Sequence, residues 1–104
     1  MKARTDGEVK RVAAEFFLNR GYVETRSRHL YEMVFDRAPK KRGRALRVRL
    51  RLHKQNDDSW RLVGTPLGVD RWRTDLESET VLPKGSDQIW GFLVEIKTRV
   101  ESAR

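Results

Sequence analysis

Residues 45–54 of this chain read ALRVRLRLHK, and they alternate strictly between apolar and basic side chains. Alternation with a period of two is typical of a β-strand with one buried and one solvated face. The apolar positions, which we expect to face the core, are Leu46, Val48, Leu50 and Leu52. The basic positions, which we expect on the opposite face, are Arg47, Arg49, Arg51 and His53. The stretch therefore predicts a strand that carries an outward row of arginines.

A second alternating segment, residues 29–36, precedes this strand and is expected to pair with it as an antiparallel hairpin. Its apolar positions are Tyr31, Met33 and Phe35. We expect the register that places Phe35 opposite Leu46, Met33 opposite Val48 and Tyr31 opposite Leu50. The same register places Glu32 opposite Arg49 on the outer face, where the two charges form a favourable cross-strand pair.

Two helices are expected, one before and one after the strands. The first covers residues 6–20, because Thr5 and Glu8 form a capping box and Val9, Val12, Ala13, Phe16 and Phe17 share one helical face. Gly21 suits the left-handed position that ends a helix. The second covers residues 87–102, where length favours a helix over the alternation that is also present. Ser86 is its expected N-cap.

The region between the hairpin and the last helix carries weaker signals. Residues 60–63 predict a third strand, with Trp60 and Leu62 facing inward. Val69, Trp72 and Leu76 have helical spacing, which predicts a short helix over residues 69–77. Together the elements predict a single α+β domain over residues 1–104, in which a three-stranded antiparallel meander is covered on one face by the N-terminal and C-terminal helices.

This order of elements resembles the topology of double-stranded-RNA-binding domains. The resemblance implies an arrangement of elements and no site residues, because the lysine-rich start of their last helix is replaced by KGSDQIW at residues 84–90.

The net charge of +8 is concentrated in one place. Residues 37–54 hold nine Lys and Arg and no acid, whereas the rest of the chain carries 14 basic and 15 acidic residues. The absence of cysteine excludes a disulfide framework and thiolate metal sites. With no secretory signal and no apolar run long enough to span a bilayer, we expect a cytoplasmic protein without a membrane span.

The basic hairpin predicts a nucleic-acid-binding protein, DNA or RNA, that contacts the phosphate backbone and needs no cofactor or metal. Alternate residues of a strand lie about 6.6 Å apart, which is comparable to the spacing of successive phosphates. The residues expected to contact nucleic acid are Arg37, Lys40, Lys41, Arg42, Arg44, Arg47, Arg49, Arg51 and Lys54. Trp72, between two arginines, is a candidate for stacking on a base.

Two other functions are consistent with the sequence. The protein could be a non-enzymatic interaction or inhibitor protein, encoded by a phage or mobile element, whose basic face docks on an acidic protein. A Mg²⁺-dependent nuclease is the third hypothesis, because Glu95 and Lys97 form an E-x-K motif downstream of Asp75. Such a site requires Glu95 on a core strand rather than on the helix that we expect.

Overall fold

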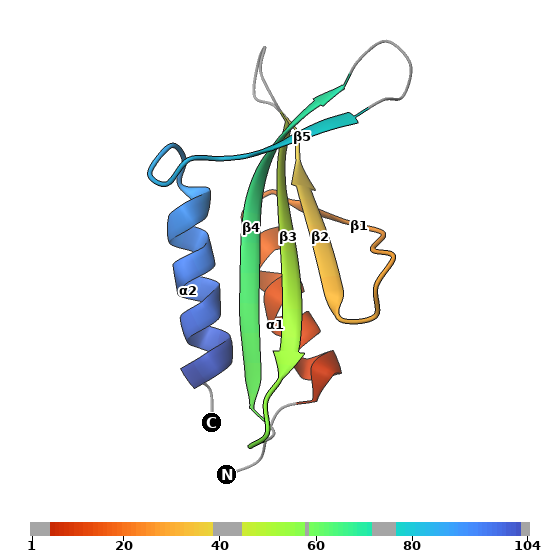
Figure 1. The fold of residues 1–104 in the computed structure, drawn as a ribbon, viewed down its shortest axis with the longest axis vertical. Coiled ribbons are helices and arrows are strands. Elements are labelled where there is room, and N and C mark those ends of the chain that lie inside the picture. Colours follow the sequence, from red (N-terminus) through yellow and green to blue (C-terminus); the bar gives the residue numbers. More distant parts are fainter. Residues whose placement is uncertain (1–4, 39–44, 58, 72–76, 103–104) are drawn as a thin grey trace.

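A sheet of five antiparallel strands forms the centre of the structure, and two helices lie along one of its faces (Figure 1). The computed structural model describes residues 5–38, 45–57, 59–71 and 77–102. In chain order the elements are α1 (Asp6–Leu18), β1 (Val23–Thr25), β2 (Glu32–Arg37), β3 (Ala45–Lys54), β4 (Trp60–Arg71), β5 (Glu77–Val81) and α2 (Ile89–Ser102). The α+β class is confirmed. The predicted number of strands was wrong, and with it the topological resemblance to double-stranded-RNA-binding domains.

The strands form a meander in which each one pairs with its neighbour in sequence, in the order β1-β2-β3-β4-β5. Only the end of β4 pairs with β5, through the register from Leu67↔Val81 to Arg71↔Glu77. At that end β5 crosses in front of β3 and β2 (Figure 1). This crossing brings the side chains of β5 over the helix-free face of the sheet.

The register of the β2–β3 hairpin differs from the predicted one by two residues. Phe35 pairs with Val48 and Met33 with Leu50, while Glu32 lies opposite Arg51 rather than Arg49. A slip of two residues keeps every side chain on the same face, so the hydrophobic pattern cannot distinguish the two registers. Tyr31 lies before β2 and is 48% exposed, contrary to its predicted place in the core.

The predicted short helix over residues 69–77 was wrong. Residues 69–71 are the end of β4, Glu77 begins β5, and residues 72–76 lie outside the described part. The predicted third strand is confirmed but is much longer, since β4 continues through Gly64, Pro66 and Gly68. These are residue types that usually mark the end or the edge of a strand.

Both predicted helices are confirmed. In α1 the Thr5 side chain accepts a hydrogen bond from the backbone N–H of Glu8 at 3.2 Å, and Gly21 adopts a φ of +84° just beyond the helix. In α2 the cap is Asp87 rather than the predicted Ser86, because its Oδ1 accepts from the N–H of Ile89 at 3.1 Å. Capping side chains of this kind satisfy donors that have no partner inside the helix.

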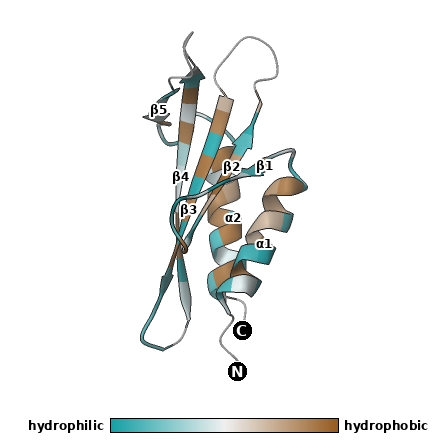
Figure 2. Ribbon diagram, turned by 90° about the vertical axis from the view of Figure 1, so that its right-hand side faces the viewer, coloured by the Kyte–Doolittle hydropathy of each residue, from teal (hydrophilic) through white to brown (hydrophobic). Residues whose placement is uncertain are grey.

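The core lies between the two helices and the face of the sheet turned toward them (Figure 2). The buried side chains of this layer are Val9, Ala13, Phe16 and Phe17 of α1, Tyr22 between α1 and β1, Met33, Phe35, Val48, Leu50, Leu52, Trp60 and Leu62 of the sheet, and Ile89, Leu93, Ile96 and Val100 of α2. Both helices therefore bury their apolar stripes on the same side. Within the described residues, the opposite face of the sheet has no helix over it.

Candidate binding groove on the helix-free face

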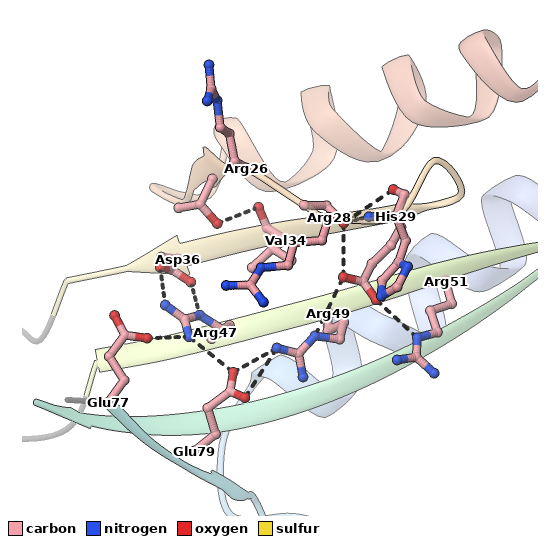
Figure 3. Close-up of a pocket in the computed structure, with 13 residues that line it drawn as sticks. Arg26, Arg28, His29, Val34, Asp36, Arg47, Arg49, Arg51, Glu77 and Glu79 are labelled. Atoms are coloured by element: carbon pink, nitrogen blue, oxygen red, sulfur yellow. Dashed lines mark hydrogen bonds and ion pairs between the residues drawn. The ribbon is translucent and has the colours of Figure 1, made fainter. Parts of the chain in front are cut away.

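A groove of about 600 Å³ runs along the helix-free face of the sheet. We call it the charged groove. Residues 25–29, at and after the end of β1, form one wall, and Glu77 and Glu79 of β5 form the other. The floor consists of β2 and β3 side chains, among them the predicted arginine row (Figure 3). The alternation of β3 explains this placement, since its apolar residues occupy the core.

Arg47 is at the centre of an ion-pair network. Its Nε and Nη2 atoms donate to the two carboxylate oxygens of Asp36 at 2.8 and 2.9 Å, and its Nη1 donates to Glu77 at 2.7 Å and to Glu79 at 3.1 Å. The side chain is only 12% exposed. Hydrogen bonds that the guanidinium donates to Asp36 raise its pKa above the ordinary value, burial opposes this, and the hydrogen bonds to Glu77 and Glu79 add to the rise. Arg47 is thus a cross-link between β2 and β5 rather than a free cation.

The next two arginines of the row are paired less completely. Arg49 donates to both carboxylate oxygens of Glu79, at 3.2 and 2.9 Å, and its Nε lies 3.9 Å from Glu32. Arg51 donates to Glu32 at 3.1 Å and its side chain remains 59% exposed. The ion pairing of the row therefore decreases from Arg47 to Arg51.

Glu32 is the most buried carboxylate of the groove, with a side chain that is 7% exposed. Burial alone would raise the pKa of its carboxyl. The hydrogen bonds from Ser27, at 2.9 Å, and from Arg51, together with the charge of Arg49, hold that pKa below its usual value. The predicted pairing of Glu32 with Arg49 is present, although Arg51 is the residue directly opposite.

The other predicted contact residues lie apart from the row. The guanidinium of Arg37 lies 5.9 Å from the centroid of the Tyr22 ring, and Lys54 is exposed at the far end of β3. Lys40, Lys41, Arg42 and Arg44 fall outside the described residues, as does Trp72.

Sequence reasoning did not single out Arg28, which lies on the wall formed by residues 25–29. Its side chain extends over the floor of the groove, while that of Arg26 points away from it (Figure 3). Both residues are exposed, and neither makes an ion pair with a carboxylate in the described part of the chain. The only signal in the sequence was the run TRSRH at residues 25–29, which contains two arginines and no acid.

The residues of the nuclease hypothesis do not form a common site in the described ranges. Glu95 and Lys97 are both exposed on α2, where two residues are separated by about 200° around the helix axis. Glu95 pairs with Arg99 at 2.8 Å and with Arg20 at 3.5 Å, and Lys97 pairs with Glu101 at 3.8 Å. Asp75 is not among the described residues.

The described residues contain no group of three or more His, Asp and Glu arranged to hold a metal ion. Neither α1 nor α2 is long and apolar enough to cross a membrane. Comparison with known proteins adds no functional information, because no family model, curated protein or solved structure shows significant similarity to this chain.

Proposed function

We propose that this protein is a non-enzymatic binding module that receives an acidic segment of a protein partner in the charged groove. The observation that carries this proposal is the position of the Arg28 side chain over the groove, where no carboxylate of the described residues pairs with it. Its guanidinium extends over the groove without a carboxylate partner in the described residues, whereas Arg47 and Arg49 on the floor are each held by at least two carboxylates. An exposed arginine with a free fork of donors is suited to bind a carboxylate.

The charge pattern of the groove favours a protein over a nucleic acid. Five arginines and four carboxylates line it, so its net charge is only +1. A nucleic acid carries a phosphate at every step, so some phosphates would lie against Glu32, Asp36, Glu77 and Glu79, whereas a peptide can carry carboxylates only where arginines receive them. Nucleic-acid binding depends on an extended field of one sign, whereas protein interfaces accommodate interleaved charges of both signs.

Exposed apolar side chains at the two edges of the sheet add to this argument. The registers align Val23, Asp36, Arg47, Leu67 and Val81 in one row across the helix-free face. Val23 at one end of the row is 64% exposed, and Val81 at the other end is 59% exposed. A polar centre flanked by apolar groups offers a protein partner both charge pairing and apolar burial.

Binding of short labelled peptides by fluorescence anisotropy at low ionic strength tests the proposal. We expect a Glu/Ser peptide to bind and a Lys/Ser peptide not to bind. We also expect Arg28→Gln to weaken binding about fivefold, the effect of one partly exposed ion pair. Arg11→Gln, an equal charge change on the exposed side of α1, is the control that should leave the affinity unchanged. Equal affinities for the acidic and basic peptides would overturn the proposal.

A second candidate function is nucleic-acid binding through the segment between β2 and β3. The described residues carry 15 Lys and Arg against 13 Asp and Glu, so six of the eight excess positive charges lie outside them. Four of these belong to Lys40, Lys41, Arg42 and Arg44, where no acid is present in the sequence. This observation favours a polyanion that contacts this segment rather than the paired arginines of β3.

Titration of labelled DNA and RNA at several salt concentrations tests the second candidate. If four cations contact phosphate, the log–log slope of affinity against salt should be about −3 to −4. Replacing Lys40, Lys41, Arg42 and Arg44 by Gln should remove that dependence, and Arg47→Gln should leave it nearly unchanged. Absence of binding at low salt would exclude this function.

A further inference from the structure

In the contact between β5 and β3, the arginine row binds carboxylates that an extended strand carries. Glu77 and Glu79 are alternate residues of an extended strand, and they bind Arg47 and Arg49, which are alternate residues of β3. Alternate residues of both strands repeat every ~6.6 Å, so successive carboxylates match successive guanidinium groups. Glu79 also bridges the two arginines, at 3.1 Å from Arg47 and 2.9 Å from Arg49.

The carboxylates of β5 pair with Arg47 and Arg49 but not with Arg51, the last arginine of the row. The next alternate residue of β5 is Val81, which has no carboxylate and pairs with Leu67. Arg51, the next arginine of β3, is bound only from β2, by Glu32, and keeps more than half of its side chain exposed. Arg28 extends over the floor of the same groove (Figure 3). Arg51, at one end of the row, and Arg28, over the floor, are therefore guanidinium groups that β5 does not reach.

We infer that the charged groove binds an extended acidic peptide with carboxylates at alternate positions, and that these carboxylates are received by Arg51 and Arg28. The inference rests on the proposed function and specifies the partner as a strand-like Glu-x-Glu or Asp-x-Asp segment. β5 is the internal example of such a segment on the same arginine row.

Three labelled peptides of equal length test the inference. The first alternates Glu and Ser. The second, the blocked peptide, has the same composition in Glu-Glu-Ser-Ser blocks, in which no two Glu residues are two positions apart. The third has Gln in place of every Glu in the alternating order. By anisotropy at low ionic strength, we expect the alternating acidic peptide to bind about fivefold more tightly than the blocked one, a difference of one exposed ion pair. Arg28→Gln should weaken its binding about fivefold, and Arg11→Gln should not.

Two further variants distinguish binding from folding. Arg51→Lys keeps the positive charge beside Glu32 but loses the planar fork, so it should lower the affinity for the alternating peptide while the protein remains folded. Glu79→Gln releases the Arg49 guanidinium from its main partner and should raise that affinity about fivefold. A loss of structure could not produce tighter binding.

The outcomes separate the inference from the function on which it rests. If the alternating and blocked acidic peptides bind equally well and both lose affinity in Arg28→Gln, the extended register is overturned and the acidic-partner function stands. If neither acidic peptide binds better than the Gln peptide, the proposed function and the inference are both overturned. Preference for the alternating peptide, lost in Arg28→Gln and strengthened in Glu79→Gln, supports both.

Discussion

Arg47 and Glu77 are 30 positions apart in the chain, and β4 lies between their strands, yet the guanidinium and the carboxylate are 2.7 Å apart. Through Arg47, Asp36 of β2 is joined to Glu77 and Glu79 of β5, and these two strands share no backbone ladder. We expect Arg47→Gln to destabilise the protein by about 3 kcal/mol, because it leaves three carboxylates without their shared counter-charge. Urea unfolding followed by circular dichroism measures the loss.

Arg61→Gln is the matched control for this change, since Arg61 is an exposed arginine of β4 on the same face. Its effect on the unfolding free energy should stay within about 0.5 kcal/mol. Equal effects of the two variants would show that the network around Arg47 adds nothing to stability.

The carboxyl of Glu32 gives stability a defined pH dependence. Its pKa is lower in the folded protein than in the unfolded chain, so its contribution is fully present above the ordinary Glu pKa of about 4.3. The contribution is lost as the pH falls through the lower folded pKa. We expect Glu32→Gln to cost about 2 kcal/mol at pH 7. The difference in unfolding free energy between Glu32→Gln and the unsubstituted protein should shrink steadily as the pH falls below ~4. A difference that stays constant with pH would contradict the prediction.

Two glycines, Gly64 in β4 and Gly91 in α2, give opposite predictions. A Cβ on Gly64 of β4 would overlap Leu93 Cδ2 and lie 3.1 Å from Leu50 Cδ2, so Gly64→Ala should cost about 1–3 kcal/mol by overpacking the core. A Cβ on Gly91 of α2 would meet nothing within 4 Å. Gly91→Ala should therefore stabilise the protein by about 0.5–1 kcal/mol through helix propensity. Thermal unfolding of both variants checks the difference in sign.

Tyr22 is buried, with 2% of its surface exposed, and its hydroxyl has no hydrogen-bond partner in the described part of the chain. Burial raises the pKa of this hydroxyl, and nearby Arg37 opposes the rise. An unsatisfied buried hydroxyl costs desolvation energy. Tyr22→Phe should therefore leave the free energy of unfolding unchanged or raise it by up to about 1 kcal/mol, which thermal unfolding measures. A clear loss of stability in Tyr22→Phe would mean that the hydroxyl has a hydrogen-bond partner in solution. Tyr31→Phe, at an exposed ring, is the control.

The sequence predicted those elements whose stability comes from burial of an apolar pattern. Both helices and the faces of β3 followed from periodicity and capping residues. The hairpin register could not be fixed in the same way, since pairing Phe35 with Leu46 or with Val48 buries the same side chains.

The elements that the sequence did not predict depend on other interactions. All five residues of β5 are exposed, and Val81 is the only apolar one, so the strand has no hydrophobic signal. Ion pairs from Glu77 and Glu79 to β3 tie it to the sheet instead. The length of β4 was hidden by Gly64, Pro66 and Gly68.

The candidate site was predicted only in part. The alternation of β3 correctly placed Arg47, Arg49 and Arg51 on the face away from the core. Their pairing with β5 depends on a strand crossing that sequence spacing does not reveal. Arg28 acquires its position from the path of the chain between β1 and β2, which no periodic pattern predicts.

The strictly sequential strand order has a consequence for how the chain reaches its native state. Each hairpin joins neighbouring strands, so the sheet can grow by successive short loop closures without waiting for a distant segment. The core is completed only by α2, the last element in chain order, whose Leu93 covers Gly64 and Leu50. During synthesis β4 therefore leaves the ribosome with its apolar face uncovered until residues 89–102 follow, and this interval is when aggregation competes most strongly with folding.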